Sequence, residues 1–255
     1  MSLSLPDRIR RTELLDQGAY APHEMRGNLA DLRRYNGWLG GARVVIRGVG
    51  MLLGRNCSGR SISLLDVATG SADIPRALVR WGHRRGLRLL PVGLDVKSDV
   101  LSEACHVHRA PGSAMRFVQA DARKLPFRDR AVDIVICSTF LHHLDRGDAV
   151  ETLREMGRVA RLGIVLVDLK RSRTAWTLLW LLTRLTTMNR LTRHDGPASV
   201  GQSFTCGELR RLAGEAGLAG AAVRDAGPAR ILLTYFRADT GRSDHGDRGR
   251  PRLRP

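Results

Sequence analysis

The pattern of apolar positions along the chain changes near residue 60. In residues 26–45, apolar side chains recur every three or four positions, which is typical of an amphipathic helix. Beyond residue 60, short apolar runs alternate with stretches long enough for helices. We therefore predict a helical N-terminal segment over 1–60 and an alternating domain over 61–237. The apolar residues at helical spacing in the first segment are Leu29, Leu32, Tyr35 and Leu39.

The alternating part predicts an α/β fold. Near-continuous apolar strands that alternate with helices are typical of a parallel sheet covered by helices on both faces. The runs that predict strands are 61–70, 89–96, 115–121, 132–140, 163–170 and 230–236. The stretches that predict helices are 73–86, 97–108, 146–161 and 206–216.

The ends of the first two predicted strands carry residues suited to a nucleotide. In an open α/β sheet, ligands bind beyond the carboxyl ends of the strands. The first strand ends at Asp66, and the small residues that follow, Ala68 and Gly70 among them, let the backbone approach a ligand closely. The second strand ends at Asp95, whose carboxylate can accept both hydrogen bonds of a ribose diol.

The next two strand ends extend this pattern. The third predicted strand runs into Asp121 and Ala122, where a carboxylate can accept a hydrogen bond from an exocyclic amine such as that of adenine. The fourth opens into Ser138, followed by two histidines. Each carboxylate alone is equally compatible with a helix cap or a solvated side chain. Four consecutive strand ends of this kind favour a cofactor site.

Together, these motifs resemble those of the class I S-adenosylmethionine-dependent methyltransferases. LLDVATGSADIP looks like the family's glycine-rich first motif, GLDV its ribose-binding motif, VQADARKLPF its adenine-side motif and VDIVICSTFLHHL its fourth strand. The resemblance implies a Rossmann-like fold with a mostly parallel seven-stranded sheet, and S-adenosylmethionine as cofactor. It also implies cofactor-binding roles for Asp66, Ala68, Gly70, Asp95, Asp121, Ala122 and Ser138.

The first motif departs from the family pattern at two positions. Ala68 and Ala72 stand where the family has its outer glycines. Alanine fits at these positions if its φ angle stays negative. If it does not, the loop is strained, and a scaffold that has lost catalysis becomes an alternative to an enzyme.

The acceptor is expected to contact the segments outside the sheet, 1–60 and 171–206. Residues 174–191 are rich in Leu and Trp and are flanked by arginines. They predict either a helix packed over the sheet edge or an apolar lid over a lipophilic acceptor, with 171–193 touching a membrane surface. These segments, with DLRRYNGWLGGARVV, resemble a bacterial subgroup near the ubiquinone/menaquinone methyltransferases. That resemblance implies a phenolic, quinone or polyketide acceptor in secondary metabolism, with O- or C-methylation left open.

Three histidines are candidate general bases for O-methylation of a phenol. His142 and His143 follow the fourth strand, and His194 stands beside Asp195. Each is equally compatible with a packing or surface role. No cluster of His, Cys and carboxylate residues at metal-ligand spacing is visible in the sequence, so no metal is predicted.

Composition adds a second function class. The formal net charge is +17, from 42 Lys and Arg against 25 Asp and Glu. Such a charge can hold RNA phosphates, so an RNA methyltransferase is the main alternative. Only three of the basic residues are lysine, however, which fits a GC-rich coding sequence equally well. The chain also lacks the N-P-P-Y/F motif of base-amine methylation, so we expect a small-molecule acceptor and no nucleic-acid partner.

Other features set broad limits. NAD binding is disfavoured because the G-x-G-x-x-G spacing is absent. The four cysteines form no C-x-x-C pair and indicate a reducing compartment. No apolar run is long enough for a membrane span, and no secretory signal is visible, so we expect a cytoplasmic protein. Residues 238–255 read as a disordered basic tail.

Overall fold

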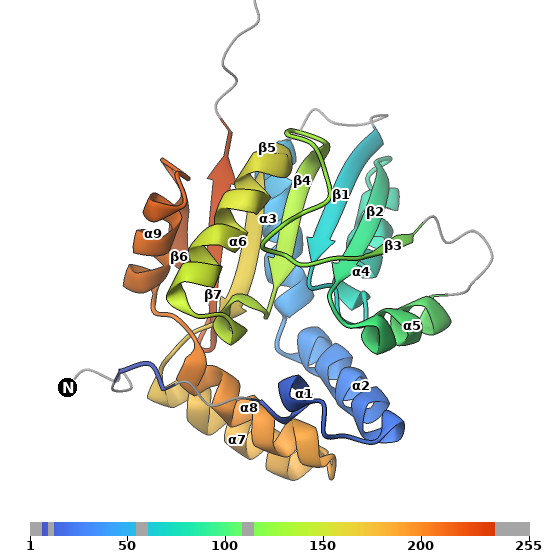
Figure 1. Ribbon diagram of the computed structural model, residues 1–255, viewed down its shortest axis with the longest axis vertical. Helices are drawn as coiled ribbons and strands as arrows, with labels where there is room; N and C mark the ends of the chain where they lie inside the picture. Colours follow the sequence, from blue (N-terminus) through green and yellow to red (C-terminus); the bar gives the residue numbers. More distant parts are fainter. Residues whose placement is uncertain (1–6, 10–12, 55–60, 109–114, 238–255) are drawn as a thin grey trace, which may run out of the picture.

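The computed structural model describes residues 7–9, 13–54, 61–108 and 115–237. The tail predicted over 238–255 lies outside the described residues. The described chain forms one seven-stranded sheet in the order β3-β2-β1-β4-β5-β7-β6, flanked by helices (Figure 1). All neighbouring pairs are parallel except those of β7, which runs antiparallel to β5 and β6. The strands are β1 (Ser61–Val67), β2 (Arg88–Asp95), β3 (Arg116–Gln119), β4 (Val132–Ser138), β5 (Ala160–Leu169), β6 (Ala222–Asp225) and β7 (Arg230–Phe236).

The apolar runs predict where the strands lie because the central strands are covered by helices on both faces. Six of the seven residues of β4 are buried, and the last seven of β5 are buried as well. Both sequences are almost continuously apolar, as two-sided burial requires. The four-residue strand β6 (AVRD) escaped the sequence analysis because it is short and half polar. The predicted α/β class is confirmed.

Two helical layers enclose the sheet. On one face, α6 (Arg146–Val159) and α9 (Cys206–Glu215) bury Leu153 and Leu209 against the sheet. On the other face, α3 (Gly41–Leu53) and α4 (Asp73–His83) bury Val49 and Leu78 against it. The helix α5 (Ser98–Val107) packs on β2 and β3 near the sheet edge. These layers position the strand ends.

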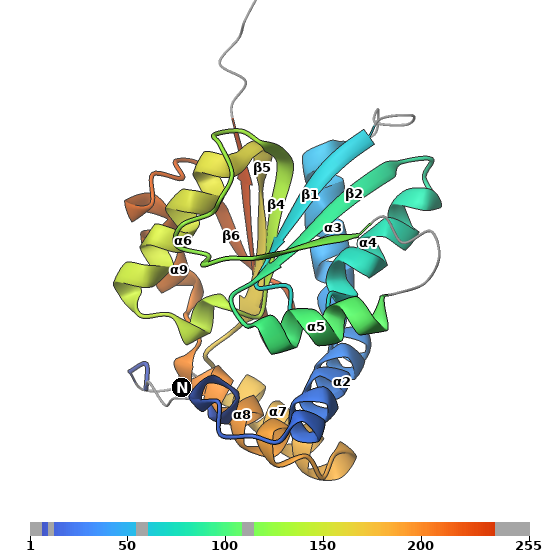
Figure 2. The same cartoon turned by 45° about the vertical axis from the view of Figure 1, so that its right-hand side comes forward.

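A group of helices lies across the carboxyl ends of the strands, at the lower end of the molecule in Figures 1 and 2. It contains α1 (Leu14–Gln17), α2 (Pro22–Trp38), α7 (Arg173–Thr186) and α8 (Arg190–Gln202), and we call it the helical cap. The helical pattern of residues 26–45 breaks at Gly40, whose φ of 71° separates α2 from α3. The cap therefore joins elements far apart in the sequence.

The helix α8 was not expected from its polar sequence, RLTRHDGPASVGQ, with Pro197 inside it. The Asn189 side chain caps it by accepting a hydrogen bond from the backbone of Thr192. Several of its polar side chains are buried and bonded to the N-terminal segment, among them Thr192, Asp195 and Ser199. Tertiary hydrogen bonds thus support a helix that periodicity did not predict. Within the described residues, every helix is too short or too polar to cross a membrane.

Candidate functional site

The loop after β1 is strained at both alanines. Ala68 has φ 55°, Gly70 has φ 52° and Ala72 has φ 57°. All three lie in the left-handed region, which costs an L residue other than glycine roughly 1–2 kcal/mol. The condition under which alanine fits without strain, a negative φ, is therefore not met at Ala68 or Ala72. The loop therefore holds a left-handed backbone at two positions that carry a Cβ atom.

Asp95 fixes this loop from the neighbouring strand. Its carboxylate accepts hydrogen bonds from the backbone N–H of Gly70 at 3.1 Å and of Lys97 at 3.1 Å. A side chain at Gly93, two residues earlier, would come within 3.0 Å of Phe117 and Thr69. The absence of a side chain there lets β2, β3 and the loop approach closely.

A first hollow, which we call the nucleoside hollow, opens beside Asp95. The predicted residues Ala68, Asp95, Asp121 and Ala122 all line it. An ion pair with Arg123 at 2.7 Å lowers the pKa of Asp121. Apolar side chains from the ends of β2 and β4 form part of its wall, together with Asp16 and Gln202 from the helical cap. These wall residues include Leu94, Val96, Phe140 and Leu144.

Three carboxylates around the loop have a raised pKa. Burial raises the pKa of Asp66 to about 8, although the Thr69 hydroxyl donates a hydrogen bond to its carboxylate at 2.7 Å. Burial also raises the pKa of Asp73 and of Asp95. A buried carboxylate that is no longer hydrated and is not fully paired with a positively charged group favours a cationic ligand. These three carboxylates therefore fit the ammonium and sulfonium groups of S-adenosylmethionine.

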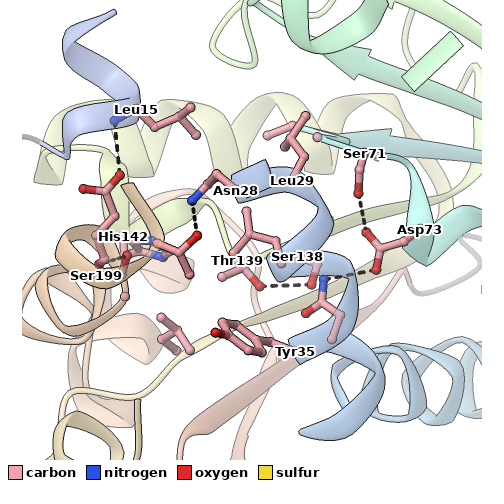
Figure 3. A pocket seen from close by; sticks show the side chains of 18 of the residues that line it. Leu15, Asn28, Leu29, Tyr35, Ser71, Asp73, Ser138, Thr139, His142 and Ser199 are labelled. Carbon is pink, nitrogen blue, oxygen red and sulfur yellow. Dashed lines mark hydrogen bonds between the residues drawn. The ribbon is translucent and has the colours of Figure 1, made fainter. Parts of the chain in front are cut away.

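A second cavity, which we call the acceptor cavity, adjoins the same loop. Figure 3 shows Ser71 and Asp73 at one end, His142 and Ser199 at the other, and Ser138, Thr139 and Tyr35 between them. The predicted residues Asp66, Ala68, Gly70 and Ser138 line it as well. Its apolar wall comes from α2, α7 and the end of β5. The apolar wall residues include Leu29, Leu32, Leu39, Leu169 and Leu179.

Two buried polar atoms of this cavity have no hydrogen-bond partner among the described residues, Asn28 Oδ1 and Arg230 Nε. The Arg230 guanidinium donates to Asn36 Oδ1 at 3.1 Å, and Asn36 in turn donates to Asp73 at 3.2 Å. Thr139, beside Arg230, has φ 57°, an unusual angle for a β-branched residue. Buried polar atoms normally have partners, so these two favour a polar ligand.

Both histidines that follow β4 line the acceptor cavity, as expected. His142 is buried, and its Nδ1 lies 2.7 Å from Asp168 Oδ1. Burial opposes its protonation, but Asp168 and Glu13 together raise its pKa to about 10. His142 therefore carries a proton near neutral pH, and in that state it is not a general base. The other histidine, His143, lies 2.6 Å from Asp16 through its Nδ1.

The third candidate histidine lies elsewhere. His194 is half exposed, and its Nδ1 lies 2.8 Å from Asp195 Oδ1. It lines a surface hollow with Trp176 and Trp180 and is not among the residues around the acceptor cavity. The structure therefore does not bring His194 to the strand ends.

The sequence analysis missed three residues of the acceptor cavity, Glu13, Asn28 and Arg230. Glu13 and Asn28 lie in the N-terminal segment, which carries no strand-end signal. Arg230 could have been identified from the sequence, because it is the one charged residue of an otherwise apolar strand, RILLTYF. The structure shows that it is buried. A buried arginine at a strand end is rare enough to mark a site.

Comparisons with known proteins agree with this geometry. Residues 64–163 match a family model described as a methyltransferase domain. The chain is 32% identical over 122 residues to the ubiquinone/menaquinone biosynthesis C-methyltransferase UbiE of Azotobacter vinelandii, which covers 47% of this chain and 46% of that protein. A relative from Idiomarina loihiensis with the same name is 31% identical over 112 residues. The chain thus matches less than half the length of these curated relatives.

Solved structures share the fold at low identity. A SAM-dependent methyltransferase from Aquifex aeolicus aligns with a TM-score of 0.56 and 16% identity, over 85% of this chain and 98% of that one. Human N-acetylserotonin methyltransferase in complex with SAM aligns with a TM-score of 0.61 and 17% identity, over 90% of this chain and 60% of that one. The predicted resemblance and the predicted Rossmann-like fold are both confirmed.

Proposed function

We propose that this chain, a class I methyltransferase by its domain and fold, transfers the methyl group of S-adenosylmethionine to a small lipophilic phenol, hydroquinone or polyketide ring. One observation carries the proposal. The strained loop after β1 lies between the nucleoside hollow and a mostly apolar cavity, and Ala68 lines both. A methyl donor held at the loop would face the acceptor cavity.

The cofactor side rests on the fit of this chain's residues. Asp95, Asp121 and Ala122 all line the nucleoside hollow, which supports a role for Asp95 toward the ribose diol and for Asp121 and Ala122 toward the adenine. The helix α4 begins at Asp73, and the positive end of its dipole there suits the methionine carboxylate. S-adenosylmethionine supplies an activated methyl group, and the protein's task is to position the acceptor and exclude water.

The acceptor side rests on shape and on the unpartnered polar atoms. Leu29, Leu32 and Leu179 provide apolar contacts for a ring. Asn28 Oδ1 can accept a hydrogen bond from an acceptor hydroxyl, and Arg230 can stabilise a developing phenolate. The helices of the cap cover the strand ends, which suits a small molecule better than a polynucleotide.

The related UbiE proteins are C-methyltransferases by name. Methylation of a ring carbon of a phenol or hydroquinone depends more on stabilising the phenolate oxygen than on a strong base near the carbon. The Arg230 guanidinium can stabilise that oxygen, and a protonated His142 does not interfere with this role. We therefore favour C-methylation over O-methylation for this cavity.

Calorimetric titration with S-adenosylmethionine and S-adenosylhomocysteine tests the cofactor part. Micromolar binding of both is expected. A folded protein that binds neither would overturn the proposal and leave a non-catalytic scaffold. Methyl transfer from labelled S-adenosylmethionine to a panel of lipophilic phenols and hydroquinones then tests the acceptor, with a short RNA duplex as the competing class.

The cap also presents an exposed apolar face. Trp176, Trp180, Leu181, Leu185 and Met188 are all more than a third exposed and lie on or just after α7. Arginines accompany them, including Arg184 and Arg193. We propose that this face meets an anionic membrane surface from which a lipophilic acceptor enters.

Sedimentation with vesicles tests this contact. Binding to vesicles of anionic lipid is expected to exceed binding to neutral ones. The double substitution Leu185→Glu and Met188→Glu is expected to abolish the difference. Met51→Glu, at an exposed apolar residue of α3, is the matched control. Equal binding of the double variant and the control would contradict the membrane proposal.

A further inference from the structure

The two histidines and Glu13 form a compact cluster at the boundary of both hollows. One ligand atom from each of Glu13, His142 and His143 lies within 4.8 Å of the others. The Nε2 atom of His142 lies 3.6 Å from Glu13 Oε1, and that of His143 lies 3.8 Å from Glu13 Oε2. Ligand atoms bound at about 2.1 Å around a tetrahedral ion are ~3.4 Å apart. The spacing is thus close to that of a metal-binding group.

Each histidine is also oriented as a metal ligand is. His142 Nδ1 faces Asp168 at 2.7 Å, and the backbone N–H of His142 donates to the same carboxylate at 3.0 Å. His143 Nδ1 faces Asp16 at 2.6 Å. Metal-bound histidines characteristically use their second nitrogen in this way, which fixes the ring and its tautomer. Both Nε2 atoms are therefore aimed at the glutamate.

The glutamate has its own supporting contacts. The hydroxyl of Ser199 donates to Glu13 Oε1 at 2.6 Å, and the side-chain amide of Gln202 donates to the same oxygen at 3.1 Å. These bonds leave Oε2 available toward His143. Glu13, Ser199 and Gln202 are all buried. The carboxylate is thus held in place by polar side chains of α8.

The charges favour a divalent cation. Three carboxylates, Glu13, Asp16 and Asp168, converge on two imidazoles, and Glu13 and Asp168 are buried. A group of buried carboxylates requires positive charge nearby. Two imidazoles and one carboxylate form a common donor set for zinc and for non-haem iron, with open positions left for substrate.

We propose that Glu13, His142 and His143 bind a divalent transition-metal ion through Glu13 Oε2 and the two Nε2 atoms. Binding of the ion displaces the proton from His142 Nε2 to solvent, because an imidazole nitrogen coordinates a metal only when it is deprotonated. The three residues line the acceptor cavity, so the remaining coordination positions face it. An oxygen of the acceptor can complete the coordination there, and the ion then lowers the pKa of that hydroxyl and fixes its position. This role rests on the proposed function, whereas the binding of the ion does not.

Cobalt(II) is a suitable probe because its visible absorption reports nitrogen and oxygen ligation directly. The full chain, treated with a chelator and dialysed, is titrated with Co²⁺ and then with competing Zn²⁺. We expect one ion per chain, with an absorption band that Zn²⁺ removes. Neither S-adenosylmethionine nor an acceptor is present, so the result is independent of methyl transfer.

Variants assign the ligands. Loss of a residue that supports a metal ligand typically weakens metal binding by ~10–100-fold. Glu13→Gln and His143→Gln remove ligands themselves, so each is expected to weaken Co²⁺ binding by at least that factor. Asp16→Asn, which weakens the support of His143 Nδ1 and also removes the ion pair of Asp16 with Lys97, is expected to weaken Co²⁺ binding by about tenfold. His83→Gln, at an exposed histidine of α4, is the matched control and should leave affinity unchanged.

Two outcomes would overturn the proposal. One is a folded wild-type chain that binds no Co²⁺ or Zn²⁺ in the micromolar range. The other is equal affinity in wild type, Glu13→Gln and His143→Gln. In either case the cluster is an ion-pair network that fastens the N-terminal segment to the strand ends. Because His143 is partly exposed, its replacement is expected to fold, which keeps the test decisive even if Glu13→Gln does not.

Discussion

The nucleoside hollow and the acceptor cavity share one loop, but they are built in different ways. The nucleoside hollow is formed mostly by residues that directly follow β1, β2, β3 and β4, so its members are local to strand ends. The acceptor cavity draws on α2, α7, α8 and β7, which are far apart in the sequence. The first is set by the topology of the sheet. The second depends on how the helical cap packs.

This difference predicts that the two sites can be damaged separately. A change at Asp95 or Asp121, which line the nucleoside hollow and not the acceptor cavity, should alter cofactor affinity and leave the cavity intact. A change in the cap should do the reverse. Ala68 and His143 are exceptions, since each lines both hollows.

The largest effect is expected from Asp95→Ala. The substitution removes the carboxylate that holds Gly70 and that we propose binds the ribose diol. Charge-assisted hydrogen bonds of this kind contribute about 1.5–3 kcal/mol, so the dissociation constant for S-adenosylmethionine should rise roughly tenfold or more. Calorimetry measures it. Asp129→Ala, at an exposed carboxylate outside both hollows, is the control. Unchanged affinity in a folded Asp95→Ala variant would remove Asp95 from the site.

The cap side is tested by Leu32→Trp. Leu32 lines the acceptor cavity but is 37% exposed, so a larger side chain there should narrow the cavity at little cost to folding. Binding of 1-naphthol, a small lipophilic phenol, should weaken by about tenfold, within the range that shape mismatch produces in apolar pockets. Intrinsic fluorescence follows this binding. S-adenosylmethionine affinity should stay the same, and a parallel loss of both would mean that the two sites are not separable.

The contrast also explains what the sequence could reveal. Asp66, Asp95, Asp121 and Ser138 were found because each directly follows an apolar run, and parallel strands bring such ends together at one edge. Glu13 and Arg230 lie 129 and 88 residues from His142, and only packing brings them to it. The break at Gly40 and the polar helix α8 follow from tertiary contacts, which periodicity does not report.

The cofactor side should make stability depend on pH. Asp66 has a folded pKa of about 8, raised by burial from a usual value of 3.8. Between about pH 4 and pH 8, Asp66 is therefore protonated in the folded state and ionised in the unfolded state. The contribution of Asp66 to the free energy of unfolding falls as the pH rises through this range. The slope for one proton is at most ~1.4 kcal/mol per pH unit.

Denaturant unfolding at several pH values measures this slope. His142, with its pKa raised to about 10, adds a decrease of the same sign above about 6.5. The difference between wild type and Asp66→Asn isolates Asp66, because asparagine keeps the shape and does not titrate. Between about pH 4 and 8 the wild type should therefore lose stability relative to Asp66→Asn, by at most ~1.4 kcal/mol per pH unit. A constant difference from pH 5 to 8 would mean that Asp66 is ionised throughout.

The smallest effects concern the shared loop, where two alanines with the same backbone angle should respond differently to glycine. Ala68→Gly removes left-handed strain at a partly exposed residue, and the gain, reduced by the added freedom of the unfolded chain, should be about 0.5–1 kcal/mol. Ala72→Gly relieves the same strain but deletes a fully buried methyl group, which costs about 0.8 kcal/mol. Its net effect should be close to zero. Urea unfolding resolves the two. Equal stabilisation would show that the site around Ala72 closes over the lost methyl group, whereas destabilisation by both would mean that the loop does not hold the left-handed conformation at these residues.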